Sequence, residues 1–275
     1  MRSAVLPVVT FGLLAMVIAD RVSTALATAS RGAPMAAPRD TLPPPVVLAG
    51  RNPAASTAPP RDPSDPAAAP NTSTIDRLAR LAARRQLTRE GGSTYLDSLI
   101  LTTDSLVRRW PDRGRTPLRV CLIEGGASGY QPRMAEFVRD AMSRWENTGM
   151  GVRFSSMSDS TDADIVVRWI DHFDFDRAGQ TDLVWDNAGR VRKAAISLAL
   201  RTNTGFQMPD AALLAVAVHE AGHALGLPHS ADSTDVMFPA TRTGTLSERD
   251  RRTAQLLYQL PTGPLRDVPE TSGDK

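Results

Sequence analysis

The sequence has one cysteine, little net charge and no long hydrophobic run, and each of these absences excludes a kind of structure or partner. A single cysteine, Cys121, cannot form an internal disulfide. It lies in PLRVCLIEG, an alternating pattern typical of a strand, where a buried thiol behaves as a small apolar side chain. The net charge is +2 at pH 7 and the arginines are spread along the chain, so we expect no nucleic-acid partner.

The first apolar run covers residues 4–19, which is short for a helix that spans a membrane. Arg2 precedes it, and the small residues of an A-x-A cleavage site follow at 25–27. This order is typical of a secretory signal, so we expect residues 1–29 to be removed and the protein to be secreted or held in the cell envelope. The alternative is an uncleaved N-terminal anchor, which would place the protein at a membrane.

Two further segments precede the main domain. Residues 30–72 are rich in proline, alanine and serine and have few large apolar groups, so we expect an extended linker. Residues 73–109 carry apolar side chains at helical spacing beside arginines, which predicts two amphipathic helices, at 74–89 and 95–110. These helices either pack on the main domain, which we favour, or form a prosegment that covers a cleft until it is removed.

The main domain is predicted at 110–262, followed by a polar tail at 263–275. The run at 163–170 is apolar enough for the middle of a sheet. The elements expected before the histidine-rich stretch are strand 118–123, helix 132–147, strands 151–156 and 163–170, and a hairpin at 178–200 that turns at 187–189.

Three of the four histidines lie in HEAGHALGLPHS, residues 219–230. A helix is predicted at 211–225, and on it His219 and His223 are one turn apart and point the same way. Gly226 follows the last good helix former and is expected to end the helix in a left-handed conformation. The chain can then reverse and carry His229 back toward the first two imidazoles.

Three neutral imidazoles on one ion leave a fourth tetrahedral position open, which is typical of a catalytic zinc site rather than a structural one. Glu220 adjoins the first ligand and can act on a water without binding the metal. The alternative is a set of ordinary core histidines. The joint register of His219, Glu220, His223, Gly226 and His229 favours the metal site.

The stretch HExxHxxGxxH, followed by Met237 within DVMFP (235–239), resembles the signature of the metzincin metalloproteases. The spacing to the methionine and the aromatic residue and proline after it are most similar to the matrixin branch. LSERDRRTAQLLY, at 246–258, also resembles the C-terminal helix of matrixin catalytic domains. Astacins and serralysins have a tyrosine where this chain has Pro239. The resemblance covers roughly residues 110–260.

The resemblance implies an α+β zincin fold: a twisted mixed sheet of about five strands with an antiparallel edge strand, an active-site helix and a C-terminal helix. It implies one catalytic Zn²⁺, Glu220 as general base and Met237 as an apolar floor beneath the imidazoles. Asp250 is a candidate brace for the methionine turn, with simple helix surface as the alternative. The function implied is that of a zinc endopeptidase, which we expect to be a monomer that binds extended polypeptide along the edge strand. A catalytically silent zinc-bearing binding module and a small-molecule hydrolase are the alternatives.

Some features of matrixins are missing from the sequence. Their propeptides often block the zinc with a PRCG-type cysteine, and this chain has no such motif. His172 is the only histidine outside the motif, so we expect no second, structural zinc. Calcium could bind a group of acidic side chains, although a solvated acidic loop is the preferred interpretation. The candidates are Asp171, Asp174, Asp176 and Asp182.

Overall fold

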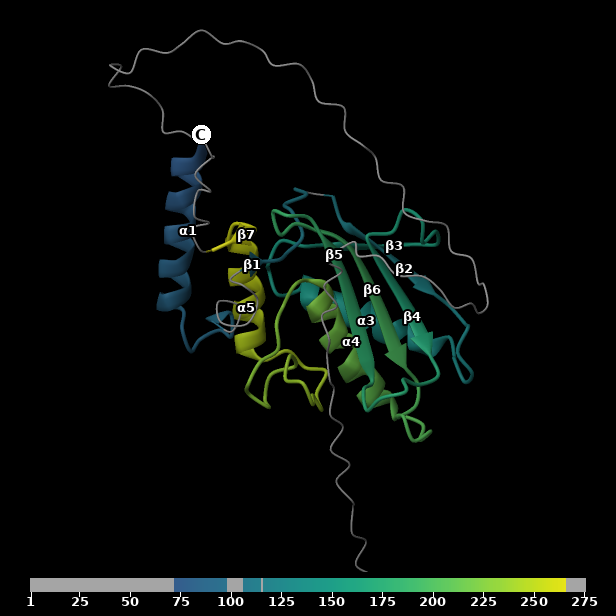
Figure 1. Ribbon diagram of the computed structural model, residues 1–275. Helices are drawn as coiled ribbons and strands as arrows, with labels where there is room; N and C mark the ends of the chain where they lie inside the picture. The colour runs from purple at the N-terminus through teal and green to yellow at the C-terminus, as the bar shows by residue number, and fades with distance from the viewer. Residues whose placement is uncertain (1–71, 98–105, 115, 266–275) are drawn as a thin grey trace, which may run out of the picture.

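The computed structural model describes residues 72–97, 106–114 and 116–265 (Figure 1). The predicted signal or anchor lies outside these residues, and so does the predicted linker except for its last residue, Thr72, which begins the first helix. Within them, no helix has both the length and the apolar character needed to cross a membrane. The elements are α1 (Thr72–Arg89), β1 (Leu106–Val107), β2 (Leu118–Ile123), α3 (Arg133–Glu146), β3 (Phe154–Met157), β4 (Ile165–Ile170), β5 (Gly179–Trp185), β6 (Val191–Ala199), α4 (Asp210–Ala224), α5 (Glu248–Gln259) and β7 (Gly263–Pro264).

Five strands form one mixed sheet in the order β3-β2-β4-β6-β5. The pairs β2 with β3, β2 with β4, and β4 with β6 are parallel. The last strand, β5, runs antiparallel to β6, and its outer edge pairs with no strand of the described chain. The predicted α+β fold with an antiparallel edge strand is therefore confirmed.

Helices α3 and α4 lie side by side against one face of this sheet (Figure 1). The buried face of α3 repeats at helical spacing through Met134, Val138, Met142 and Trp145. By contrast, α4 is buried almost all round, because it packs on β5 and β6 as well as on α3. A helix buried along most of its length suits an element that carries a functional site.

The elements expected in the main domain agree with the structure to within three residues at their ends. The hairpin turns where predicted, and Gly189 there has a φ of 73°. The largest shift is at the second strand, which begins at Phe154 rather than at 151. Gly151 has a φ of 86°, outside the range of a strand, and the Glu146 carboxylate accepts a hydrogen bond from the Phe154 backbone N–H at 3.1 Å.

The N-terminal helix α1 packs beside α5 (Figure 1). Ala83 and Leu87 are buried, and the Gln86 side chain donates to Gln259 at 3.1 Å. The prediction of a second helix in this region is wrong at its C-terminal end. The residues there form β1, which pairs antiparallel with β7, a strand at the start of the predicted polar tail. The backbone of Leu106 and Val107 is paired with this strand rather than within a helix.

Candidate metal centre

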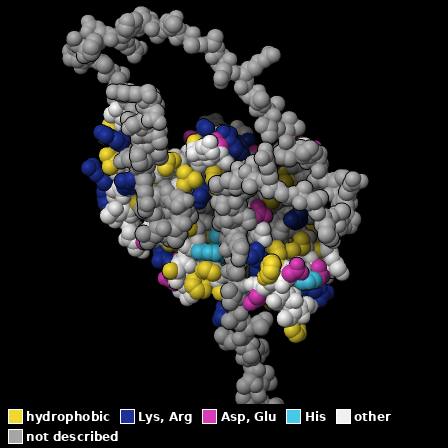
Figure 2. All heavy atoms as spheres, viewed as in Figure 1, with side chains coloured by type: hydrophobic (Ala, Val, Ile, Leu, Met, Phe, Trp, Pro, Cys, Tyr) yellow, Lys and Arg dark blue, Asp and Glu magenta, His cyan; other side chains and the backbone are white. Residues whose placement is uncertain are grey.

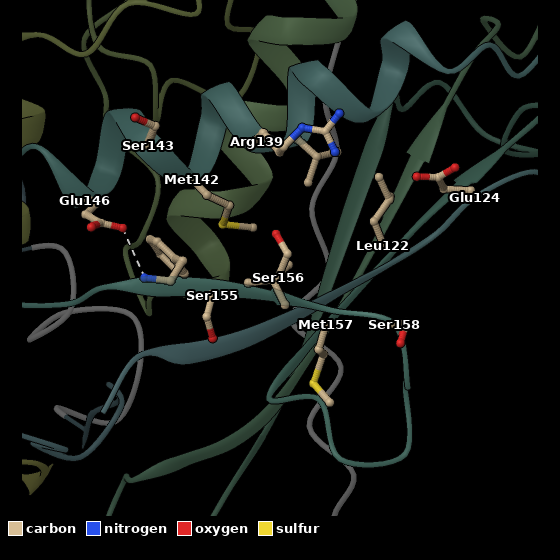
Figure 3. Close-up of a pocket in the computed structure, with 13 residues that line it drawn as sticks. Leu122, Glu124, Arg139, Met142, Ser143, Glu146, Ser155, Ser156, Met157 and Ser158 are labelled. Atoms are coloured by element: carbon tan, nitrogen blue, oxygen red, sulfur yellow. Dashed lines mark hydrogen bonds between the residues drawn. The ribbon is translucent and has the colours of Figure 1, made fainter. Parts of the chain in front are cut away.

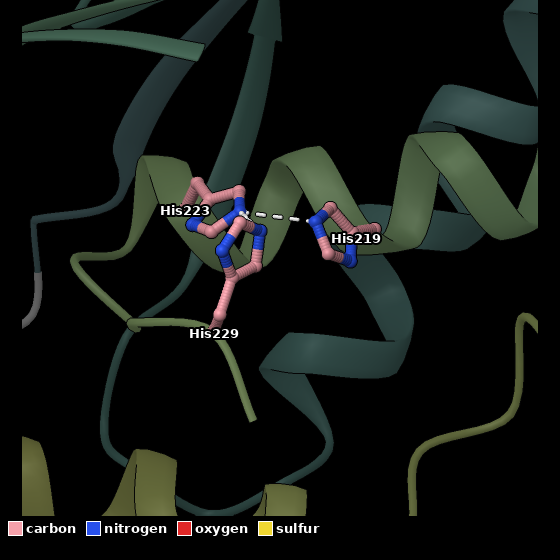
Figure 4. Close-up of side chains that lie close together, drawn as sticks. All are labelled: His219, His223 and His229. Carbon is pink, nitrogen blue, oxygen red and sulfur yellow. Dashed lines mark hydrogen bonds between the residues drawn. The ribbon is translucent and has the colours of Figure 1, made fainter. Parts of the chain in front are cut away.

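The three histidines of the motif converge on one point (Figure 4). His219 and His223 project from the same side of α4, and His229 approaches from the segment after the helix. The Nε2 atom of His223 lies 3.0 Å from that of His219 and 3.2 Å from that of His229. In the described part of the chain, no other three histidine, cysteine or acidic side chains form a group that could hold a metal.

The local sequence explains why the chain reverses between the second and third histidines. The N–H of Gly226 donates to the His223 carbonyl at 2.8 Å, and the N–H of Leu227 donates to the Gly222 carbonyl at 3.1 Å. This pair of bonds is a Schellman motif, in which a left-handed residue ends a helix. Gly226 has a φ of 97°, and a Cβ there would collide with the carbonyl of Arg108. Both the left-handed backbone conformation and the lack of space for a Cβ therefore require glycine at this position.

Backbone carbonyls determine which nitrogen of each helical imidazole faces the centre. The Nδ1 atom of His219 lies 2.7 Å from the Val236 carbonyl, and that of His223 lies 2.9 Å from the Leu227 carbonyl. Because a carbonyl only accepts, each Nδ1 must carry the proton, and each Nε2 then presents a lone pair. Two lone pairs 3.0 Å apart repel each other unless a cation lies between them. The donor set therefore fits a metal ion.

The electrostatic environment also favours neutral imidazoles. Burial lowers the pKa of His219 well below the usual histidine value, and the neighbouring His223 lowers it further. Burial and the proximity of His229 lower the pKa of His223 to about 3. Both rings are therefore uncharged at neutral pH, and no proton must leave before they bind a cation. His229 is half-buried and His172 is exposed. Histidine side chains are visible on the face of the molecule shown in Figure 2.

Glu220 follows the first histidine on α4 and is only 1% exposed. Its carboxylate does not join the three imidazoles but lies toward the edge strand β5. There the Thr181 hydroxyl donates to Glu220 Oε2 at 2.7 Å. The structure therefore places a carboxylate next to the histidine cluster without making it a member of that cluster.

Met237 is fully buried beneath α4. Its sulfur lies against Gly222, where an added Cβ would also come within 2.8 Å of the Trp145 ring. The Trp145 indole N–H donates to the Val218 carbonyl of α4 at 2.8 Å. The N–H of Ser230, next to the third histidine, donates to the Met237 carbonyl at 2.9 Å. The methionine turn is thus in contact with the helix and bonded to the segment that carries His229.

Asp250, at the start of α5, is fully buried. Its Oδ2 accepts hydrogen bonds from the N–H groups of Val236 at 2.9 Å and Ser247 at 2.8 Å. Its Oδ1 accepts a bond from the Tyr95 hydroxyl at 2.9 Å. Since Val236 also accepts the bond from His219, this carboxylate is two hydrogen bonds away from the histidine cluster.

Sequence reasoning missed several residues around the methionine turn. Asp235 is 1% exposed and accepts hydrogen bonds from Ser230, from Ser247 at 2.7 Å and from the Arg249 guanidinium at 2.8 Å. The S-x-x-D spacing of residues 247–250 is typical of a capping box, and it forms one on α5. This spacing could have indicated the part of the network that involves Ser247. The burial of Asp235 could not be predicted from the sequence, because the loop around it is polar.

The acidic candidates for calcium do not gather into a site. Asp171 instead contacts His172 at 2.7 Å and Arg201 at 3.3 Å, and Asp182 accepts a hydrogen bond from Gln180. Cys121 is buried, as its strand pattern predicted.

A cavity of about 630 Å³ lies between α3 and the strands β2 and β3 (Figure 3). Its lining includes the apolar side chains of Leu122, Met142 and Phe154 and several serines. It contains none of the residues predicted to form the site, so its volume gives no reason to move the functional site away from the histidines.

Part of the chain matches the model of a known protein family. Residues 126–259 match the peptidase M10 family model, described as matrixin. The match begins before α3 and ends with α5, so it includes the histidine cluster, the methionine turn and Asp250. No curated protein matched the chain.

Proposed function

The chain carries a matrixin-like metzincin catalytic domain, and from this premise we propose that it is a secreted zinc-dependent endopeptidase acting on extended polypeptides. The family is one of zinc metallopeptidases. The observation that carries the proposal for this chain is the convergence of three imidazole Nε2 atoms beside a separately held carboxylate.

In this proposal His219, His223 and His229 hold the zinc, and Glu220 is the general base. An ion held by these imidazoles would supply Lewis-acid chemistry: it would make a nearby water more acidic and polarise the carbonyl of the peptide bond to be cleaved. Glu220 takes a proton from the attacking water and passes it to the departing amine. Its burial excludes competing solvent, and the imidazoles of His219 and His223 stay neutral because their pKa values are low.

The free edge of β5 supports a polypeptide substrate. An extended peptide can add to this edge through main-chain hydrogen bonds, which demand little of the peptide's sequence. Thr181, on this strand, contacts Glu220, so a peptide paired with β5 would lie close to the base. This arrangement favours a peptidase over the hydrolysis of small molecules. We further propose that the protein acts as a monomer and that its N-terminal segment directs it out of the cytoplasm.

The test compares the chain from residue 31 onward with its Glu220→Ala variant, each incubated with an unfolded protein. We expect internal cleavage by the first, detected by mass spectrometry, and none by the variant, while both bind about one zinc per chain. A chelator should stop the cleavage, and added zinc should restore it. If the unaltered protein binds zinc but cleaves nothing, the endopeptidase is contradicted and a zinc-bearing binding module is supported.

A further inference from the structure

We propose that Thr181 is a positioning residue for Glu220 and that Gly179 provides the space in which the Glu220 carboxylate lies. This inference rests on the proposed function, because it gives the edge strand a part in orienting the general base. It assigns to β5 a role beyond pairing with the substrate backbone.

Gly179 and Thr181 lie on the same face of β5, because alternate residues of a strand point the same way. Both are buried, and Thr181 is only 2% exposed. The Thr181 hydroxyl lies 2.7 Å from the Oε2 atom of Glu220 and 3.0 Å from its backbone carbonyl. A hydroxyl carries one hydrogen, and an ionised carboxylate is the stronger acceptor. The hydroxyl therefore donates to the carboxylate and anchors it to β5.

Gly179 is explained by space rather than by backbone conformation. Its φ lies outside the left-handed region, so any residue could adopt this backbone. A Cβ there, however, would lie 2.6 Å from Cγ and 2.7 Å from Cδ of Glu220. Glycine within a strand often marks such a close approach. The Glu220 side chain thus packs directly on the strand backbone, with the Thr181 hydroxyl as its donor.

A general base beside a cation needs such a restraint. Glutamate has several rotatable bonds, and a free carboxylate next to three metal ligands could turn toward the ion and become a ligand itself. A base must also lie within hydrogen-bond reach of the proton that it removes. The contacts with Thr181 and Gly179 hold the carboxylate on the β5 side, where a peptide paired with that strand would pass.

The test uses a matched pair of variants in the zinc-loaded protein. Thr181→Val keeps the shape of the side chain and removes the hydroxyl, whereas Thr181→Ser keeps the hydroxyl. Removing an outer partner of a catalytic group commonly lowers activity about 10–100-fold. We expect a loss of that size in kcat for Thr181→Val, with KM and zinc content nearly unchanged, and recovery of most of the loss in Thr181→Ser. Gly179→Ala should also lower kcat, because the added methyl displaces the carboxylate.

Crystal structures of the two threonine variants separate this inference from the proposed function. The proposal requires the Glu220 carboxylate to keep its place in Thr181→Ser and to move in Thr181→Val. An unmoved carboxylate in Thr181→Val, or a kcat equal to that of the unaltered protein, would overturn it. If the unaltered protein cleaves nothing, the proposed function fails, and the carboxylate positions still decide the role of Thr181. Urea unfolding shows whether any loss reflects poor folding.

Discussion

At the scale of single residues, the burial of two imidazoles determines how the site responds to pH. The pKa values of His219 and His223 lie below the ordinary histidine value because charging a buried ring is unfavourable. In the unfolded chain both rings would titrate near their usual value of about 6.5. As pH falls below that value, the unfolded state therefore binds more protons than the folded state, and stability is lost. Above it, the two states bind equal numbers of protons at these rings, and stability does not change.

We expect the metal-free protein to show this loss directly. Between about pH 6.5 and 5, its free energy of unfolding should fall by about 1.4 kcal/mol per pH unit for each of the two histidines, as full protonation of the unfolded chain is approached. The measurement is urea unfolding at a series of pH values with a chelator present. His223→Gln removes one titrating ring, so its slope should be shallower. Equal slopes in the two proteins would show that His223 does not titrate as its burial requires.

At the scale of elements, α4 is the helix whose packing holds the site. Gly222 interrupts a run of good helix formers, and in an isolated helix alanine there would be better by about 1 kcal/mol. The structure reverses this preference. Met237 and Trp145, both buried, lie where the alanine Cβ would be. Their contact with the helix backbone holds the methionine turn under the histidines.

We therefore predict that Gly222→Ala destabilises the zinc-loaded protein by about 1–3 kcal/mol, because overpacking outweighs helix propensity. Urea unfolding at pH 7 measures the change. Gly244→Ala serves as the control. Its nearest neighbour would be the flexible Leu214 side chain at 3.3 Å. Gly244→Ala should therefore destabilise the protein less than Gly222→Ala. If Gly222→Ala instead stabilised the protein, the methionine turn would be able to move away from the helix without loss of stability, and the prediction would be wrong.

At the scale of the whole molecule, hydrogen bonds join the N-terminal segment to the histidine cluster. Tyr95 is 4% exposed, its N–H donates to the Thr253 hydroxyl of α5 at 3.3 Å, and its own hydroxyl donates to Asp250 at 2.9 Å. Burial and the nearby Asp250 raise the pKa of Tyr95 well above its usual value, so the hydroxyl keeps its proton and remains a donor. Through Asp250 and Val236 the segment reaches His219. These contacts favour a permanent part of the domain over a removable prosegment.

We predict that Tyr95→Phe lowers the stability by about 1–3 kcal/mol, because a buried carboxylate loses a donor. It should also speed the loss of zinc to a chelator. The matched control is Tyr130→Phe. The buried Tyr130 hydroxyl has no hydrogen-bond partner among the described residues, so its removal should be nearly neutral. Equal effects of the two changes would show that the Tyr95 bond does not brace the methionine turn.

The sequence alone determined the histidine-bearing helix, the turn after it, the main strands and the family resemblance. Each of these depends on short spacings, such as His219 to His223, or on periodicity, and both follow from backbone geometry that is the same in every protein. Only the tertiary structure decided which strand faces Glu220, that Asp235 is buried, and that β1 pairs with β7. These contacts join residues far apart in the chain, and their partners are selected by packing rather than by local preference.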